Sequence, residues 1–69
     1  MKIVSGKKLL NILKSKGWVV VKIEASHHKL SHPDEDFTVV VPVHSNRDLK
    51  VGLLKRIMKD TGLDEKDLS

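Results

Sequence analysis

Apolar residues follow a helical spacing near the two ends of the chain. The pattern predicts one helix over residues 5–16 and a second over residues 50–61, each with one apolar face. Ser5 is suited to cap the first helix, and Gly17 and Gly62 stand where the two helices should end. We expect the apolar face of the second helix to be core rather than a ligand pocket; it consists of Leu53, Leu54, Ile57 and Met58.

The middle of the chain changes to the β-branched composition that is typical of strands. Three strands are predicted, over residues 18–24, 27–32 and 37–41, and Pro42 closes the third. The phase of the first strand is open, because apolar residues fall on both of its faces. The two sets are Val19, Val21 and Ile23 on one face and Trp18 and Val20 on the other. Short links between the strands favour an antiparallel meander.

These elements follow the order α-β-β-β-α and predict an α+β fold with a three-stranded antiparallel sheet. Two helices can cover one face of such a sheet, which leaves the other face to solvent or to a partner. We expect a single domain over residues 1–69, in which residues 64–69 form a polar tail that frays.

The charge balance of the chain predicts an anionic partner. Thirteen Lys and Arg stand against nine Asp and Glu, a net charge of +4, and nucleic acid is the commonest partner of such a chain. The absence of Cys excludes disulfides and thiolate metal sites. One Trp, one Phe and no Tyr argue against aromatic platforms for single-stranded bases. No apolar run is long enough for a membrane span or a signal peptide, so we expect a soluble cytoplasmic protein with no membrane partner.

Four histidines are the candidates for chemistry, because imidazole can exchange a proton near neutral pH. A specific metal site is disfavoured, since His28 and His32 would lie roughly 13 Å apart on an extended strand. His27 would face the other way, and His44 follows the third strand. RNA carries its own nucleophile, the 2′-hydroxyl, so one positioned histidine and a few cations can promote its cleavage without a metal or cofactor. The spacing alone leaves open whether His28 has this role or is an ordinary surface residue.

Five short motifs then follow one another along the chain. They are Ser26-His27-His28, His32-Pro33-Asp34, Val41-Pro42-Val43-His44, Asp48-Leu49-Lys50-x-Gly52-x-Leu54-x-x-Ile57 and Thr61-Gly62-Leu63. In this order and spacing they resemble the HicA family, the toxins of HicA–HicB toxin–antitoxin pairs. The resemblance extends from the first helix to Leu63.

This resemblance implies a fold like that of a double-stranded-RNA-binding domain, with both helices on one sheet face. It implies a toxin that acts as a ribosome-independent endoribonuclease on mRNA, with RNA as substrate and a HicB antitoxin as the partner that blocks the active site. The family's catalytic histidine closes a Gly-Ser-x-His pattern, which falls on His28. Ser26 and the adjacent His27 are then supporting residues of the active site. No cofactor is implied.

The chain departs from the family pattern at two positions. Ala25 replaces the usual Gly before Ser26, and an alanine would be strained there if the turn needs a positive φ. Val51 replaces a frequent Pro before Gly52, which removes a favourable residue from the first turn of the second helix. Neither change removes His28.

Candidate contacts to RNA phosphates are the basic residues on the two helices and beside His28. They are Lys7, Lys8, Lys29, Lys50, Lys55 and Arg56. Two other interpretations stay open at this point. A non-catalytic RNA-binding module of the same fold would bind RNA without cleaving it. A pure interaction protein, with its open sheet face against another chain, would have no affinity for RNA.

Overall fold

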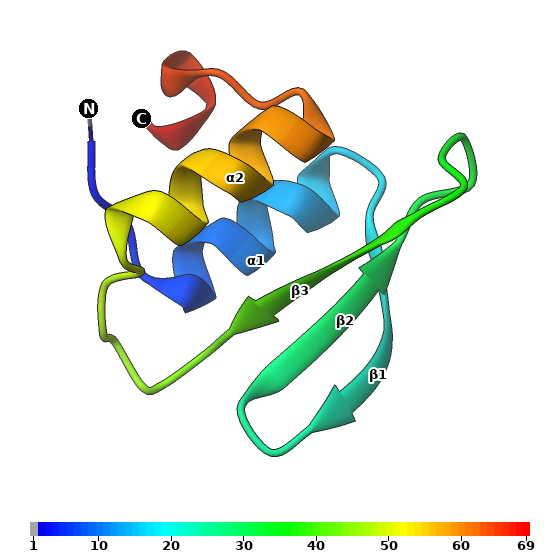
Figure 1. Ribbon diagram of the computed structural model, residues 1–69, viewed down its shortest axis with the longest axis horizontal. Helices are drawn as coiled ribbons and strands as arrows, with labels where there is room; N and C mark the ends of the chain where they lie inside the picture. Colours follow the sequence, from blue (N-terminus) through cyan, green and yellow to red (C-terminus); the bar gives the residue numbers. More distant parts are fainter. Residues whose placement is uncertain (1) are drawn as a thin grey trace.

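The chain forms two helices and a three-stranded sheet, as Figure 1 shows. The computed structural model describes residues 2–69. Its elements are α1 (Gly6–Ser15), β1 (Val19–Glu24), β2 (His27–Ser31), β3 (Thr38–Pro42), α2 (Val51–Thr61) and the 3-10 helix η1 (Glu65–Leu68). The predicted order α-β-β-β-α is confirmed, and with it the α+β fold resembling a double-stranded-RNA-binding domain. None of the helices in this part of the chain is long and apolar enough to cross a membrane.

Local signals in the sequence set the ends of both helices. The Ser5 hydroxyl accepts a hydrogen bond of 3.1 Å from the backbone N–H of Lys8 and so caps α1. Gly17 (φ 98°) and Gly62 (φ 76°) take the left-handed conformation just after α1 and α2. Within residues 2–69 no side chain caps the first turn of α2, which begins after Lys50.

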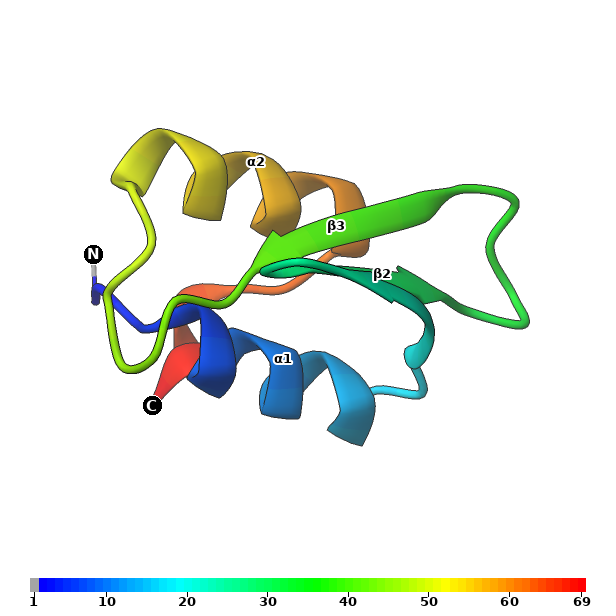
Figure 2. The ribbon, with the colours of Figure 1, turned by 90° about the horizontal axis from the view of Figure 1, so that it is seen from below.

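The sheet has the strand order β1-β2-β3, and both neighbouring pairs are antiparallel. Both helices lie on one of its faces, on the same side of the strands in Figure 1, and Figure 2 gives a second view of this arrangement. Leu30, Val39 and Val41 point toward the helices and are buried. His28 pairs with Val41, so its side chain shares this helix-facing side of the sheet.

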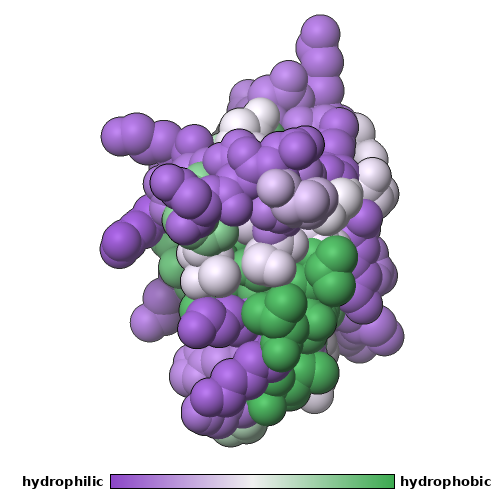
Figure 3. Space-filling view, turned by 90° about the vertical axis from the view of Figure 1, so that its right-hand side faces the viewer, coloured by the Kyte–Doolittle hydropathy of each residue, from purple (hydrophilic) through white to green (hydrophobic). Residues whose placement is uncertain are grey.

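The structure settles the phase of β1. Trp18 is buried and Val20 is half-buried, because these two residues lie on the side of the helices. A bulge follows Val20 and shifts the register with β2. The other apolar residues of β1 are exposed, by 56% at Val19, 56% at Val21 and 61% at Ile23. Ile23 pairs with His28 beyond the bulge and so lies on the helix-facing side, whereas Val19, before the bulge, lies on the outer face. Figure 3 shows an apolar patch on one side of the molecule.

The segment after Gly62 corrects the expectation of a frayed tail. Its last four residues before Ser69 form η1, in which Asp64 and Asp67 make a reciprocal capping box. Leu68 is fully buried in the core, and Lys16 forms a salt bridge of 3.0 Å with Asp67. Backbone and side-chain hydrogen bonds, the largest from Asp64 and the next from Lys16, lower the pKa of the Asp67 carboxyl. The buried Leu68 and the capping box therefore fix this segment against the core, although most of its residues are polar.

Candidate active site at one end of the sheet

The turn between β1 and β2 consists of Ala25 and Ser26, because Glu24 pairs with His27 across it. Ala25 has a φ of 53°, in the left-handed region that L-residues other than Asn and Asp rarely adopt. A positive φ at the first of two turn residues is where a type II′ hairpin favours glycine. The strain expected for alanine at this position is therefore present, while the two-residue turn itself is kept.

The orientation of His28 is set by the backbone of this turn. The Ser26 carbonyl lies 3.1 Å from Nδ1 of His28 and also accepts a hydrogen bond of 2.8 Å from the Val43 N–H. Because a carbonyl only accepts, Nδ1 must carry the hydrogen, and Nε2 of the neutral ring carries a lone pair. Nε2 makes no hydrogen bond to any other group in residues 2–69. The ring is half-buried, fixed at one nitrogen and open at the other.

His44 joins the same end of the sheet from the loop that follows β3. Its Nε2 lies 3.3 Å from the Ser26 hydroxyl. Ser26 thus contacts His28 through its carbonyl and His44 through its side chain. Figure 1 shows the β1–β2 turn and the loop before α2 on the same side of the molecule.

His27 lies apart from this pair. It follows Ser26 directly, but its side chain points to the sheet face away from the helices and is exposed. There it lines a shallow hollow of about 170 Å³ with Lys22, Glu24 and Lys29. Of the two supporting residues that the sequence suggested, the structure brings Ser26 to His28 and places His27 on the opposite face.

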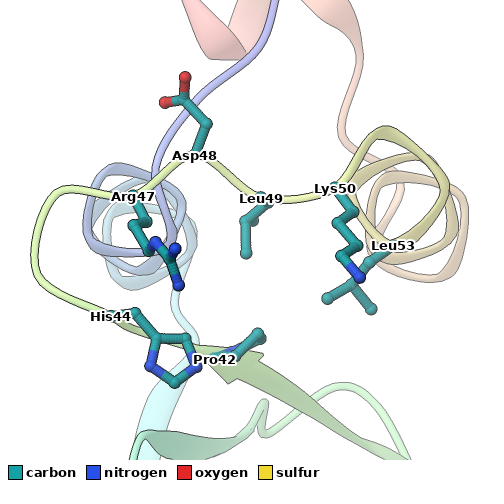
Figure 4. A pocket seen from close by; sticks show the side chains of 7 residues that line it. All are labelled: Pro42, His44, Arg47, Asp48, Leu49, Lys50 and Leu53. Carbon is teal, nitrogen blue, oxygen red and sulfur yellow. The ribbon is translucent and has the colours of Figure 1, made fainter.

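A cavity of about 390 Å³ lies between the end of β3 and the first turn of α2, and we call it the loop cavity. It is lined by Pro42, His44, Arg47, Asp48, Leu49, Lys50 and Leu53. Figure 4 shows the side chains of Arg47 and Lys50 directed toward the cavity, whereas the Asp48 carboxylate points away from it.

For two residues of this cavity, the position in the structure differs from what the sequence predicted. Leu53 was expected in the core, yet it is half-buried and forms part of the wall. Arg47 was not among the candidate RNA contacts, and its only signal was the polar run from His44 to Asp48. Of the predicted phosphate contacts, Lys50 alone lines this cavity.

Comparison with known proteins adds a decisive observation. The family model described as HicA toxin of bacterial toxin–antitoxin matches residues 6–63, which is most of the chain. The chain belongs to the HicA toxin family. Among curated proteins, none matches it. Membership in the HicA family makes the chain the toxin of a toxin–antitoxin system, with an antitoxin as its partner.

His32, which follows β2 in this HicA toxin, is hydrogen-bonded to the backbone through both ring nitrogens. His32 donates from Nε2 to the Lys16 carbonyl at 3.0 Å and accepts at Nδ1 from the Asp34 N–H at 3.0 Å. Its ring packs edge-on against Trp18, with 5.2 Å between ring centroids. A Cβ at Gly17 would lie only 2.8 Å from His32 Nε2, so the neighbouring turn requires glycine. Both nitrogens are engaged, and His32 holds the turn after α1.

The other predicted phosphate contacts of the HicA toxin are spread over its surface. Lys7 on α1 and the two cations of α2 (Lys55 and Arg56) are exposed, and Lys29 lies on the outer sheet face. Lys8 is half-buried, and hydrogen bonding and repulsion from Lys2 lower its pKa. Among residues 2–69, no group of three or more His, Asp or Glu side chains lies close enough to share a metal ion.

Proposed function

We propose that this HicA toxin is a metal-independent, ribosome-independent endoribonuclease that cleaves mRNA in the cytoplasm, with His28 as its catalytic residue. One observation carries the proposal. The Ser26 carbonyl holds Nδ1 of His28 at 3.1 Å, which leaves the lone pair of Nε2 without a partner in residues 2–69. A general base needs this arrangement: one nitrogen fixed by an acceptor, and the other free to take a proton.

The reaction that fits this group is internal transesterification of RNA. Nε2 takes the proton of a 2′-hydroxyl, and the 2′-oxygen forms a bond to the adjacent phosphorus. The bond from phosphorus to the 5′-oxygen of the next nucleotide breaks, and that oxygen leaves with a proton from the protonated ring or from water. The products are a 2′,3′-cyclic phosphate and a 5′-hydroxyl. General-base assistance by one histidine contributes about 10²- to 10⁴-fold, so we expect a slow nuclease.

Ser26 is proposed as the residue that positions the catalytic ring. Its carbonyl is itself held in place, because it accepts a second hydrogen bond of 2.8 Å from the Val43 N–H. This bond ties the β1–β2 turn to the strand end at Pro42 and limits the movement of the acceptor. His27 stays a supporting residue only in the sense that it can bind RNA from the outer face, where Lys22 and Lys29 add positive charge.

The test is cleavage of a long, mixed-sequence RNA by purified protein in EDTA. The native chain is compared with His28→Ala and with His27→Ala, which is the matched control because it removes the neighbouring imidazole from the opposite face. We expect cleavage by the native chain, a loss of at least about 100-fold in His28→Ala and a much smaller loss in His27→Ala. Mass spectrometry should find 2′,3′-cyclic phosphate ends.

Two results would contradict the assignment. A larger loss in His27→Ala than in His28→Ala would move the active site to the outer sheet face. RNA binding without cleavage by any of the three proteins would make the chain a non-catalytic RNA-binding module. Unfolding temperatures of all variants, measured by circular dichroism, show that any loss of cleavage is not a loss of fold.

We also propose that the antitoxin is of the HicB kind and inhibits by covering the end of the sheet that holds His28. Membership in a toxin family with antitoxin partners supports this proposal. Addition of one equivalent of the purified antitoxin should stop RNA cleavage and protect the backbone N–H groups of residues 25–28 from hydrogen exchange. Inhibition with protection elsewhere would contradict the proposed position of the antitoxin.

A further inference from the structure

We propose that the loop cavity binds one nucleotide of the RNA substrate beside the bond that is cut, with its phosphate held by Arg47 and Lys50. The identity of the polymer rests on the proposed function, but binding of a single nucleotide does not. The cavity thereby becomes a substrate subsite distinct from the catalytic ring of His28.

The size and construction of the cavity suit a small rigid ligand. Its volume of about 390 Å³ lies in the range of ligand sites in proteins. The loop that forms it is fixed at both ends, by the hydrogen bond from Val43 to Ser26 and by one of 2.9 Å from the Leu49 N–H to the Val4 carbonyl. A third bond of 2.9 Å, from the Arg47 N–H to the His44 carbonyl, closes a turn within the loop. A site that is already ordered loses little entropy when a ligand binds.

The charges around the cavity favour an anion. Arg47 and Lys50 are its two permanent cations, and Figure 4 shows both side chains directed toward it. The single acid of the lining, Asp48, points its carboxylate away, and no salt bridge is formed by Arg47 or Lys50 within residues 2–69. A guanidinium that is not engaged by a protein carboxylate can bind two phosphate oxygens at once.

The rest of the lining is apolar and suits the base or ribose of a nucleotide. Pro42, Leu49 and Leu53 form this part of the wall. Leu53 stands on the apolar side of α2, but it is only half-buried, while its neighbours Leu54 and Ile57 are buried in the core. A nucleotide has the complementary chemistry: an anionic phosphate that fits the cations, and a flat, largely apolar ring that fits the apolar wall.

The cavity is connected to the catalytic ring through one residue. Ser26 contacts Nδ1 of His28 through its carbonyl (3.1 Å) and Nε2 of His44 through its hydroxyl (3.3 Å). His44 in turn lines the cavity. His28 and the His44 wall of the cavity therefore both adjoin Ser26, and the placement of a neighbouring nucleotide in the cavity rests on this juxtaposition.

The first experiment is an NMR titration of the native chain with adenosine 3′,5′-bisphosphate, a nucleotide that the enzyme cannot cleave. We expect the largest shifts in backbone N–H signals of residues 42–53. Adenosine and inorganic phosphate are titrated separately, and each should bind more weakly than the bisphosphate, because each has only half of the required chemistry. A short 2′-O-methyl RNA, which lacks the nucleophile, should displace the bisphosphate.

Three substitutions test the role of the two cations. Arg47→Ala and Lys50→Ala should each weaken bisphosphate binding by about tenfold, as expected for the loss of a charged hydrogen-bond donor. Lys59→Ala, which removes one positive charge from the last turn of α2, should change the affinity by less than about twofold. All three side chains are exposed, so the fold should be kept.

Several outcomes would overturn the inference. These are shifts confined to other parts of the chain, an equal loss in Lys59→Ala, binding of phosphate alone as tight as that of the bisphosphate, and failure of the 2′-O-methyl RNA to compete. Each of them can occur while the native chain still cleaves RNA, so they are distinguishable from failure of the proposed nuclease function. Conversely, binding and competition at the cavity in a chain that cuts nothing would support nucleotide binding there and contradict the proposed nuclease function.

Discussion

The two ends of β2 carry histidines on the same side of the sheet, yet the two rings differ in their hydrogen bonding. At one end, His32 uses both nitrogens on backbone groups, the Lys16 carbonyl and the Asp34 N–H. At the other end, the hydrogen bond that His28 makes within residues 2–69 uses Nδ1, on the Ser26 carbonyl, and leaves Nε2 without one. A ring with two backbone partners ties together the segments that hold these partners, whereas a ring with one partner leaves its second nitrogen accessible to a ligand.

The backbone turns next to the two histidines differ in how well their residues fit a positive φ. Gly17 has a φ of 98° beside His32, and a Cβ there would meet the ring at 2.8 Å, so glycine fits both the backbone and the packing. Ala25 has a φ of 53° before Ser26, where alanine is strained. The His32 end is built for stability, and the His28 end keeps a strained turn that presents an open nitrogen. Such strain is common where structure serves a binding or catalytic site.

The largest effect that separates the two ends should be on the rate of RNA cleavage. We expect His28→Ala to lower the cleavage rate by at least about 100-fold, because it removes the ring that the Ser26 carbonyl holds by Nδ1, while the unfolding temperature changes little. His32→Gln, at a temperature where it is folded, should cleave at nearly the native rate. Rates from single-turnover assays on RNA check both variants. Equal rate losses at the two histidines would remove the distinction between them.

The second effect is on stability, and here we expect the larger loss at His32 rather than at His28. His32→Ala should lower the free energy of unfolding by about 2–3 kcal/mol, since it removes two hydrogen bonds and the contact with Trp18. The loss also leaves the Lys16 carbonyl and the Asp34 N–H without this partner. Urea denaturation followed by Trp18 fluorescence measures the change. A loss below that of His28→Ala would show that His32 is not the structural member of the pair.

The sequence predicted the features that depend on neighbouring residues. Ser5, Gly17, Gly62 and Pro42 end their elements as expected, because caps and breakers act over a few residues. The shared side of His28 and His32 also followed from the period of a strand. The HicA resemblance is confirmed by a family match over residues 6–63.

Features that depend on tertiary contacts were not predictable in the same way. The phase of β1 stayed open until the packing showed Trp18 inside and Val19 outside. The tail looked polar because only Leu63 and Leu68 are apolar in it, and nothing local shows that both reach the core. Arg47 was missed since a polar loop gives no sign of which side chains will surround a cavity. The bond from His32 to the Lys16 carbonyl likewise joins residues that are far apart in sequence, and it is the bond that His28 lacks.

The third prediction tests the strained turn. Ala25→Gly should raise the free energy of unfolding by about 1 kcal/mol, because glycine adopts a positive φ without steric cost and this gain exceeds its entropic loss. Gly17→Ala should act in the opposite direction and by more, since the new Cβ also meets His32. Urea denaturation of both variants provides the comparison. A destabilised Ala25→Gly would mean that the turn carries no strain.

The smallest effect concerns acid and the His32 end, where Asp67 ties η1 to α1. Hydrogen bonds from the Asp64 backbone and from Lys16 lower the folded-state pKa of Asp67 below the ordinary carboxyl value of 3.8. A depressed folded pKa means that the ionised form stabilises the fold: the contribution is complete above 3.8 and is lost as the pH falls through the lower folded pKa. We therefore expect Asp67→Asn to be slightly less stable than the native chain at pH 7, with the difference vanishing in acid. Asp60→Asn, for which no ion pair is formed in residues 2–69, is the control and should show a much smaller difference at pH 7. A difference between Asp67→Asn and the native chain that persists unchanged below the folded pKa would mean that packing rather than charge ties η1 to the His32 end.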